Sequence, residues 1–155
     1  MLPLDHLPIL LVEDSDDDLF FFKRLLGKTG LNPALAVATD GQQAVAYLKR
    51  SVHADLPGHP PIPVLIFLDL KLPLKGGFEV LQWIRTQEAL AKTAVVILSS
   101  SAESRDVSRA FKWGAQSYLV KYPEPAILAE VVQRVAALDR AADIDTLELP
   151  GLWRP

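Results

Sequence analysis

The sequence predicts an α/β domain in which five parallel strands form a doubly wound sheet with helices on both faces. Short apolar runs alternate five times with longer segments of helical periodicity, the pattern of a parallel sheet covered by helices. Several of these runs end abruptly in charged or hydroxyl residues. The chain has 155 residues, 50% of them hydrophobic, which suits one domain that buries roughly two thirds of its unfolded surface.

The predicted strands are short apolar runs bounded by turn residues. They cover residues 9–13, 34–38, 64–69, 94–99 and 117–120. Crossovers between parallel strands are right-handed, so the first and last helices should lie on one face and the three middle helices on the other. The strand order is then 2-1-3-4-5.

Five amphipathic helices are predicted between and after the strands. The first begins at Asp16 or Asp17 and stops at Gly27 or Gly30, and the second covers about residues 41–51. Apolar residues at helical spacing define the other three: Phe78, Leu81 and Ile84; Val107, Ala110 and Phe111; and Ile127, Val131, Val135 and Leu138. Residues 53–63 carry four prolines and one glycine, which predicts a surface loop.

Composition excludes several classes of function. The chain has no cysteine, so disulfides, thiolate zinc sites and cysteine nucleophiles are excluded. The formal charge is -3 and no basic run is present, so we expect no nucleic-acid partner. Residues 1–7 show neither a signal peptide nor a membrane span, so we expect no membrane partner and a cytoplasmic protein.

Acidic residues end two strands that the predicted order makes neighbours. Glu13 and Asp14 follow the first strand, and Asp69 ends the third. In an open α/β sheet, ligands bind at the carboxyl ends of the strands where the strand order reverses, which is between these two strands. Three carboxylates this close repel one another, and an all-oxygen set suits Mg²⁺ better than zinc. The sequence therefore predicts a magnesium site.

A pocket in which a bound metal neutralises the carboxylates favours the transfer of a phosphoryl group. Asp69 can attack phosphorus and form an acyl phosphate. The fourth strand ends in Ser99 and Ser100, whose hydroxyl and N–H groups suit phosphoryl oxygens, and the fifth ends in Lys121, a point-charge phosphate binder. Each residue alone has a structural explanation, but acids ending two adjacent strands with a lysine ending a third favour a site. Residues 16–18, three aspartates, are instead assigned to capping the first helix.

Four motifs resemble the receiver domain of two-component response regulators, which has a flavodoxin-like fold. They are Leu11-Val12-Glu13-Asp14, Leu68-Asp69-Leu70-Lys71-Leu72-Pro73 with Gly77, Ile97-Leu98-Ser99-Ser100 and Tyr118-Leu119-Val120-Lys121. Each motif alone is modest, but all four stand at strand ends in the same order as in the family. The resemblance covers residues 8 to about 142.

The resemblance implies a role for each pocket residue. Asp69 would be the phosphoacceptor, and Asp14 and Asp69 would bind Mg²⁺ directly, with Glu13 acting through water and Lys71 through its backbone carbonyl. Ser99 would be the switch hydroxyl, Lys121 the cation that pairs with the phosphoryl group, and Tyr118 the aromatic residue whose burial reports activation. A sensor histidine kinase would supply the phosphoryl group, and the protein would be no enzyme beyond its own phosphorylation and dephosphorylation.

Features outside the four motifs indicate which kind of response regulator the chain resembles. Residues 1–142 are predicted to be the receiver domain of a single-domain regulator that signals through protein contacts. Its acidic opening, long loop and tail resemble regulators paired with bacterial phytochrome kinases. Residues 143–155 are predicted to be an exposed dimerisation arm, with folding back onto the domain as the alternative; the arm residues are Leu147, Leu149, Leu152 and Trp153.

Two positions depart from the family pattern. Lys71 stands two places after the phosphoacceptor, where smaller or polar residues are common, and Tyr122 separates Lys121 from Pro123. Because a cis bond before a residue other than proline costs about 2.5 to 4 kcal/mol, a trans Lys121-Tyr122 bond is predicted. These departures keep a pseudo-receiver binding module as an alternative. A phosphohydrolase is a weaker alternative because Lys71 stands where such an enzyme needs a second acid.

Overall fold

Five parallel strands form one sheet in the computed structural model, which describes residues 2–152. The strand order is β2-β1-β3-β4-β5, as predicted. The strands are β1 (Pro8–Val12), β2 (Ala34–Ala38), β3 (Leu65–Asp69), β4 (Ala94–Ser99) and β5 (Ser117–Val120). Each lies within one residue of its predicted bounds, because buried apolar runs between turn residues have few other ways to satisfy their backbone groups.

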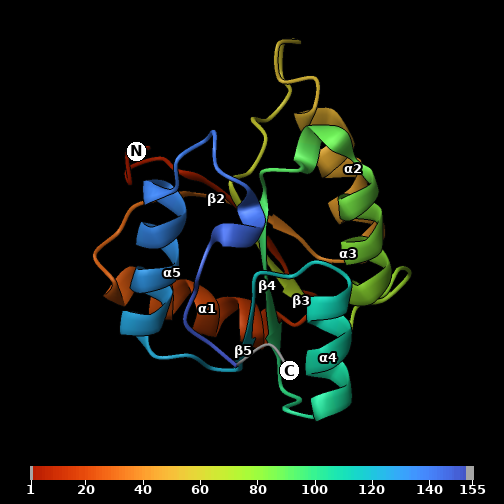
Figure 1. Ribbon diagram of the computed structural model, residues 1–155, viewed down its shortest axis with the longest axis vertical. Helices are drawn as coiled ribbons and strands as arrows, with labels where there is room; N and C mark the ends of the chain where they lie inside the picture. The colour runs from red at the N-terminus through yellow and green to blue at the C-terminus, as the bar shows by residue number, and fades with distance from the viewer. Residues whose placement is uncertain (1, 153–155) are drawn as a thin grey trace.

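Helices cover both faces of the sheet in the predicted arrangement (Figure 1). On one face lie α1 (Asp16–Lys28) and α5 (Pro125–Ala137). On the other lie α2 (Gly41–Ser51), α3 (Gly77–Thr86) and α4 (Ser104–Lys112). Two short 3₁₀ helices, η1 (Glu88–Leu90) and η2 (Ile144–Thr146), follow α3 and α5. The segment between α2 and β3 contains turns but no helix or strand, as expected from its prolines.

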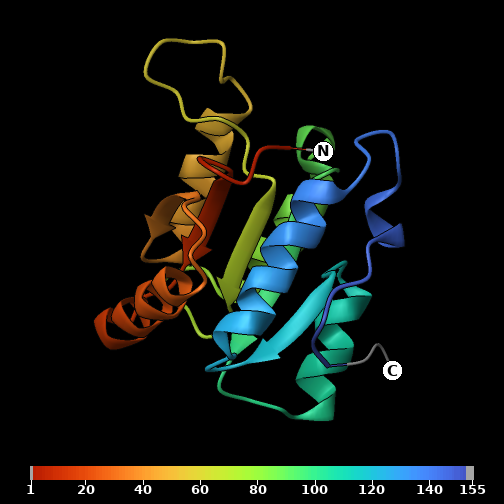
Figure 2. The same cartoon turned by 90° about the vertical axis from the view of Figure 1, so that its left-hand side faces the viewer.

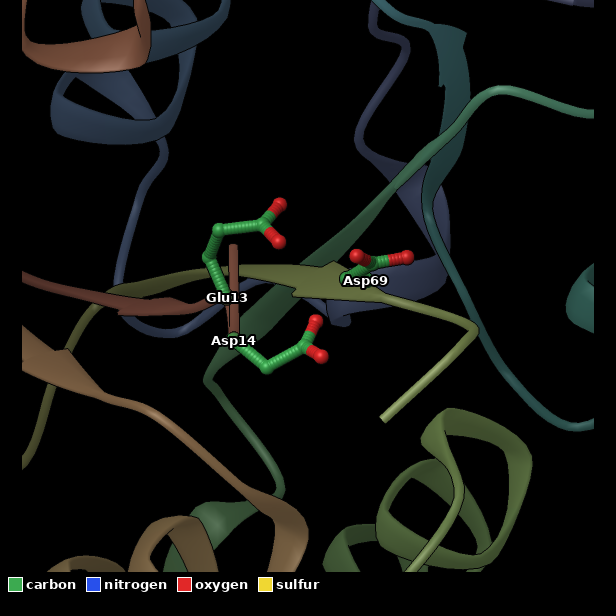
Figure 3. A group of neighbouring side chains, drawn as sticks. All are labelled: Glu13, Asp14 and Asp69. Atoms are coloured by element: carbon green, nitrogen blue, oxygen red, sulfur yellow. The ribbon is translucent and has the colours of Figure 1, made fainter. Parts of the chain in front are cut away.

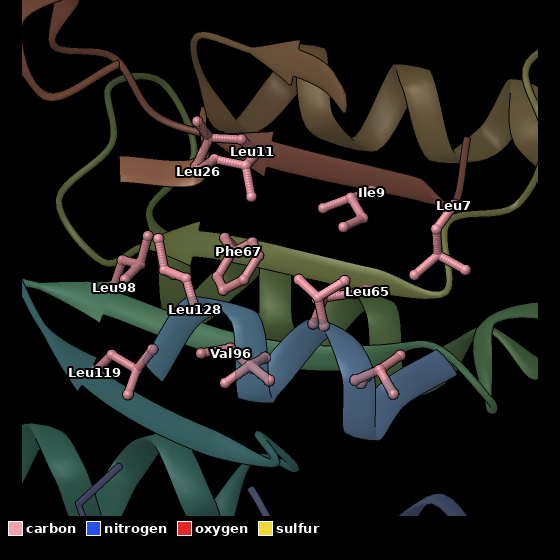
Figure 4. Packing of buried hydrophobic residues seen from close by; sticks show 14 of the residues in the cluster. Leu7, Ile9, Leu11, Leu26, Leu65, Phe67, Val96, Leu98, Leu119 and Leu128 are labelled. Carbon is pink, nitrogen blue, oxygen red and sulfur yellow. The ribbon is translucent and has the colours of Figure 1, made fainter. Parts of the chain in front are cut away.

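The central strand β3 is buried on both faces, which fixes the position of the carboxylate at its end. Phe67 packs against Phe22 of α1 with ring centroids 5.0 Å apart, and Leu128 of α5 belongs to the same cluster (Figure 4). The alternate residues Ile66 and Leu68 face α2, α3 and α4. Because a packed interior resists small displacements, Asp69 is held by a rigid support.

Helix α1 is capped by a serine and not by the aspartates that follow. Ser15 is the N-cap, and its Oγ accepts a hydrogen bond of 3.2 Å from the backbone N–H of Asp18. The three aspartates occupy the first turn, where negative charge is favourable beside the positive end of the helix dipole. The prediction that the aspartates cap the helix is therefore wrong, although their charge does favour its N-terminal end. The side chain of Asp18 remains available for another contact.

The C-terminal segment packs on its own domain, which overturns the premise that it is an exposed arm. Leu147 is 8% exposed and joins the core cluster on the α1–α5 face, as does Ile144, while Leu149 packs against the edge of that cluster. Leu152 is 38% exposed, and Trp153 lies outside the described residues. The apolar residues of this segment indicated that it is buried against some surface. The sequence did not indicate whether that surface belongs to the same chain or to a second copy. The dimer itself stays a prediction.

The last described residues run beside β5 (Figure 2), and two hydrogen bonds join them to this strand. The Leu152 N–H donates to the carbonyl of Tyr118 at 2.9 Å, and the Ser117 hydroxyl donates to the carbonyl of Pro150 at 2.6 Å. Between them Gly151 has a φ of +140°, and a Cβ at this position would lie 2.3 Å from the Ser117 oxygen. Glycine is needed there because both the backbone angle and the close approach exclude a side chain.

Within residues 2–152, no helix combines the length and the apolar character needed to cross a membrane.

Candidate functional site

Three acidic side chains meet at the carboxyl ends of β1 and β3 (Figure 3). The strands are in register, with Val12 opposite Leu68, so the residues that follow each strand are brought together. One carboxylate oxygen from each of Glu13, Asp14 and Asp69 lies within 4.8 Å of the others. Glu13 and Asp69 are buried and Asp14 is exposed, so the cluster opens to solvent on one side. The predicted grouping of these acids is confirmed.

Lys121, at the end of β5, reaches into this acidic cluster. Its Nζ lies 2.8 Å from Glu13 Oε2 and 3.0 Å from Asp69 Oδ2. A third contact of 2.7 Å joins it to Asp18 Oδ2. An ammonium group has three N–H donors, so these three carboxylates occupy its full donor capacity.

Asp18 is the functional contact that sequence reasoning missed. Its position in a run of three aspartates at a helix start favoured a capping role. A usable signal was its place in the first turn of a helix whose N-cap directly follows Asp14, because this turn lies next to the predicted pocket.

Asp69 is held through both of its carboxylate oxygens. Oδ1 accepts a hydrogen bond of 3.1 Å from the backbone N–H of Lys71, and Oδ2 faces Lys121. Gly77, the first residue of α3, lies directly against this strand end, where an added Cβ would come within 2.2 Å of the Asp69 carbonyl oxygen. The loop from Asp69 to α3 can close this tightly only because residue 77 has no side chain.

The electrostatics of the pocket follow from burial and from Lys121. Burial raises the pKa of Glu13 to about 7, against the lowering effect of its hydrogen bond with Lys121. Burial would lower the pKa of Lys121, but hydrogen bonds to Asp18, Glu13 and Asp69 outweigh it and raise that pKa. Burial likewise opposes ionisation of Asp18, yet its bonds from Lys121 and Tyr122 lower the pKa of this carboxyl. Lys121 is therefore charged and favours the ionised form of Asp18, whereas burial makes Glu13 harder to ionise.

The bond between Lys121 and Tyr122 is cis, so the predicted trans geometry is wrong. The prediction weighed the local cost of a cis bond alone. In the structure, contacts on both sides of the bond hold the two residues in place: Lys121 binds the acids, and the Tyr122 hydroxyl donates to Asp18 Oδ1. The Tyr122 ring also packs against Phe21 of α1, with centroids 5.3 Å apart.

This arrangement of acids and lysine at the ends of three strands agrees with a sequence match. Residues 9–133 match the model of the response regulator receiver domain. The chain belongs to the response regulator receiver family.

Relatives of this receiver domain include regulators linked by name to phytochromes. The response regulator Rcp1 of Synechocystis sp. is 32% identical over 143 residues, which is 92% of each chain. The solved bacteriophytochrome response regulator AtBRR is 34% identical with a TM-score of 0.70, covering 90% of this chain and 98% of that one. The phosphorylated cyanobacterial phytochrome response regulator RcpA is 30% identical with a TM-score of 0.67, covering 83% of this chain and 89% of that one.

A metal fits the receiver pocket on the basis of its ligand atoms. Rcp1 has also been solved in a Mn²⁺-bound form, which is 32% identical to this chain with a TM-score of 0.65 and covers 92% of this chain and 98% of that one. The three carboxylates converge within the distance that one cation requires, and oxygen ligands are those that Mg²⁺ and Mn²⁺ prefer.

Of the residues assigned to switching, Ser99 and Ser100 lie at the carboxyl end of β4, and Tyr118 lies in the neighbouring strand β5. Ser99 is buried, and its Oγ accepts a hydrogen bond of 3.1 Å from the Ser101 N–H, whereas Ser100 is exposed. Tyr118 is fully buried, with its hydroxyl donating to the Ser101 carbonyl at 2.7 Å. Tyr118 is therefore buried in this structure, and its role in reporting activation stays a prediction.

Proposed function

We propose that this receiver domain accepts a phosphoryl group on Asp69 from a sensor histidine kinase, in a Mg²⁺-dependent reaction, and signals through protein contacts. The observation that carries the proposal is the convergence of Glu13, Asp14, Asp69 and Lys121 at one edge of the sheet. Three acids that can share one cation, with a lysine beside two of them and an opening to solvent, favour a binding site over a purely structural ion-pair network.

Asp14 and Asp69 are the residues proposed to bind Mg²⁺ directly. Glu13 would act through a water molecule, and the Lys71 carbonyl would complete the protein ligands. The metal, when bound, supplies positive charge that offsets the negative charge of the carboxylates and of the incoming phosphoryl oxygens.

Asp69 is the proposed nucleophile. One of its carboxylate oxygens forms a bond to phosphorus while the bond between phosphorus and the donor nitrogen or oxygen breaks, and the electron pair leaves with the donor. Lys121 then exchanges its bond with Asp69 for a bond to a phosphoryl oxygen, and the Ser99 hydroxyl donates to another. Ser100 is assigned only its backbone N–H in this step, since its side chain is exposed.

A kinase of the bacterial phytochrome type is the proposed partner, in the cytoplasm. The support is the similarity to AtBRR and RcpA over most of their length. Transfer from a purified autophosphorylated bacteriophytochrome kinase should reach this chain faster than transfer from an unrelated histidine kinase. Equal rates from both would contradict the phytochrome pairing and leave the phosphoacceptor role in place.

Incubation of the protein with acetyl phosphate and Mg²⁺ tests the chemistry. A stable acid-labile adduct on intact protein is expected, and it should disappear in Asp69→Asn or after chelation of the metal. Asp17→Asn, which removes an exposed acid from the first turn of α1, is the matched control and should keep the adduct. No adduct on the wild-type chain would favour a binding module without phosphotransfer, and continuous release of phosphate would favour a hydrolase.

A further inference from the structure

Asp18 occupies a donor of Lys121 that would otherwise be open to a second phosphoryl oxygen. The three N–H groups of Lys121 face Glu13, Asp18 and Asp69 at 2.8, 2.7 and 3.0 Å. Asp69 is the acceptor that carries the phosphoryl group in the proposed function, so its contact is replaced when the adduct forms. Asp18 is neither nucleophile nor metal ligand, and its contact is the shortest of the three.

The carboxylate of Asp18 is fixed from a second side. Its Oδ2 accepts from Lys121, and its Oδ1 accepts from the Tyr122 hydroxyl. The Tyr122 ring packs against Phe21, one turn further along the same face of α1. The group formed by Asp18, Tyr122 and Phe21, the α1 latch, therefore joins the start of α1 to the residues that follow β5.

Lys121 does not depend on Asp18 for its position in the pocket. Glu13, only 3% exposed, also holds the ammonium, and Asp69 holds it from β3. With Asp18 removed, two acids still orient the lysine and one N–H is free. What Asp18 adds is a competing acceptor and a negative charge on the side of the pocket where phosphoryl oxygens would gather.

We propose that Asp18, held by Tyr122, is a positioning residue that draws Lys121 away from the phosphoryl group and so limits how strongly this pocket retains it. The inference rests on the proposed function. The retained state ends when water attacks phosphorus and the bond to the Asp69 oxygen breaks, which restores the carboxylate and releases inorganic phosphate. A lysine released from Asp18 would bind the phosphoryl oxygens more fully and favour the phosphorylated form.

Binding of beryllium trifluoride, a phosphoryl mimic, at saturating Mg²⁺ tests the inference without turnover. Amide NMR titration of the full chain should show that Asp18→Asn lowers the half-saturating concentration of the mimic by about fivefold, because one partly screened charge is removed next to the anion. Asp17→Asn removes the same charge one residue earlier, where the side chain is exposed and is not one of the three Lys121 partners, and should change the value by less than about twofold.

Tyr122→Phe supplies a second perturbation that keeps every charge. It removes the hydroxyl bond to Asp18 but leaves the ring on Phe21, so the half-saturating concentration should fall by about twofold. The melting temperature and the affinity for Mg²⁺ alone report separately whether either variant has merely disturbed the fold or the metal ligands.

The outcomes separate this inference from the proposed function. Tighter binding in Asp18→Asn with an unchanged Asp17→Asn supports the α1 latch. Equal or weaker binding in Asp18→Asn, when the wild type binds the mimic, overturns the inference alone. Absence of binding by the wild type and by Asp18→Asn overturns both.

Discussion

Replacement of Lys121 by methionine should make the stability of this domain depend on its metal. The variant keeps the aliphatic stem of the side chain and removes the ammonium that neutralises Glu13, Asp18 and Asp69. The lysine side chain is 10% exposed and two of its partners are below 10%, so water cannot replace it well as a counter-charge.

The magnitude follows from this burial. Breaking a buried ion pair by removing one partner costs about 3 to 5 kcal/mol of unfolding free energy. The value here should be near the lower limit, about 3 kcal/mol with the metal chelated, because Asp18 is 22% exposed and partly screened. Saturating Mg²⁺ binds the folded state and supplies the missing positive charge, so the cost should fall to about 1 kcal/mol.

Urea unfolding followed by circular dichroism measures both values, once in chelator and once in Mg²⁺. Lys23→Met, which removes an exposed lysine of α1, is the control and should change stability by less than about 0.5 kcal/mol under either condition. A loss for Lys121→Met that is the same with and without metal would refute the reasoning, since the lysine and the cation would then not share the same carboxylates.

Further predictions concern Glu13, the tail and the turn after β3. With the metal chelated, the raised pKa of Glu13 gives a contribution to stability that is fully present below pH about 4.5 and is lost as the pH rises through about 7; Glu13→Gln should lack this loss in urea unfolding measured across that range. The same group must be ionised to assist Mg²⁺, so calorimetry should show the metal affinity falling below pH 7 in the wild type and staying flatter in Glu13→Gln. Leu147→Ala should cost about 2 to 3 kcal/mol because the side chain is buried, and Leu152→Ala less than about 1 kcal/mol; an unfolding midpoint that shifts with protein concentration would instead indicate that the tail packs on a second copy. Gly77→Ala should lose about 2 kcal/mol and also weaken Mg²⁺ binding, because the new methyl group displaces the Asp69 backbone; stability lost with unchanged metal affinity would contradict this link.

Sequence patterns predicted those parts of the site that depend on strand ends. Asp69 and Lys121 each end an apolar run, and the parallel order of such runs leaves one edge at which their side chains can meet. The contact of Asp18 with Lys121 was not predictable in this way, because it depends on how far α1 turns back over the pocket. Local propensity offered an adequate explanation of the acid, and the tertiary contact overrode it.

The predictions of a trans Lys121-Tyr122 bond and of an exposed tail were wrong for a related reason, while dimerisation through the tail stays a prediction. The trans prediction used an intrinsic preference, whereas contacts of Tyr122 with Asp18 and α1 accompany the observed geometry. The tail prediction used the apolar character of Leu147, which two surfaces satisfy equally well in a sequence. Its burial on the domain's own core comes with backbone bonds to β5 that no side-chain pattern encodes.

The attachment of the tail along β5 also bears on how the molecule behaves at high concentration. An edge strand of a sheet has unpaired backbone N–H and C=O groups that can pair with a strand of another molecule. Exposed edge strands therefore promote aggregation. The bond from Leu152 to the Tyr118 carbonyl occupies part of this strand's free side, and Gly151 brings the backbone close enough to shield it. Truncation of the protein before Pro150 is therefore expected to uncover this edge of β5 and to promote aggregation at high concentration.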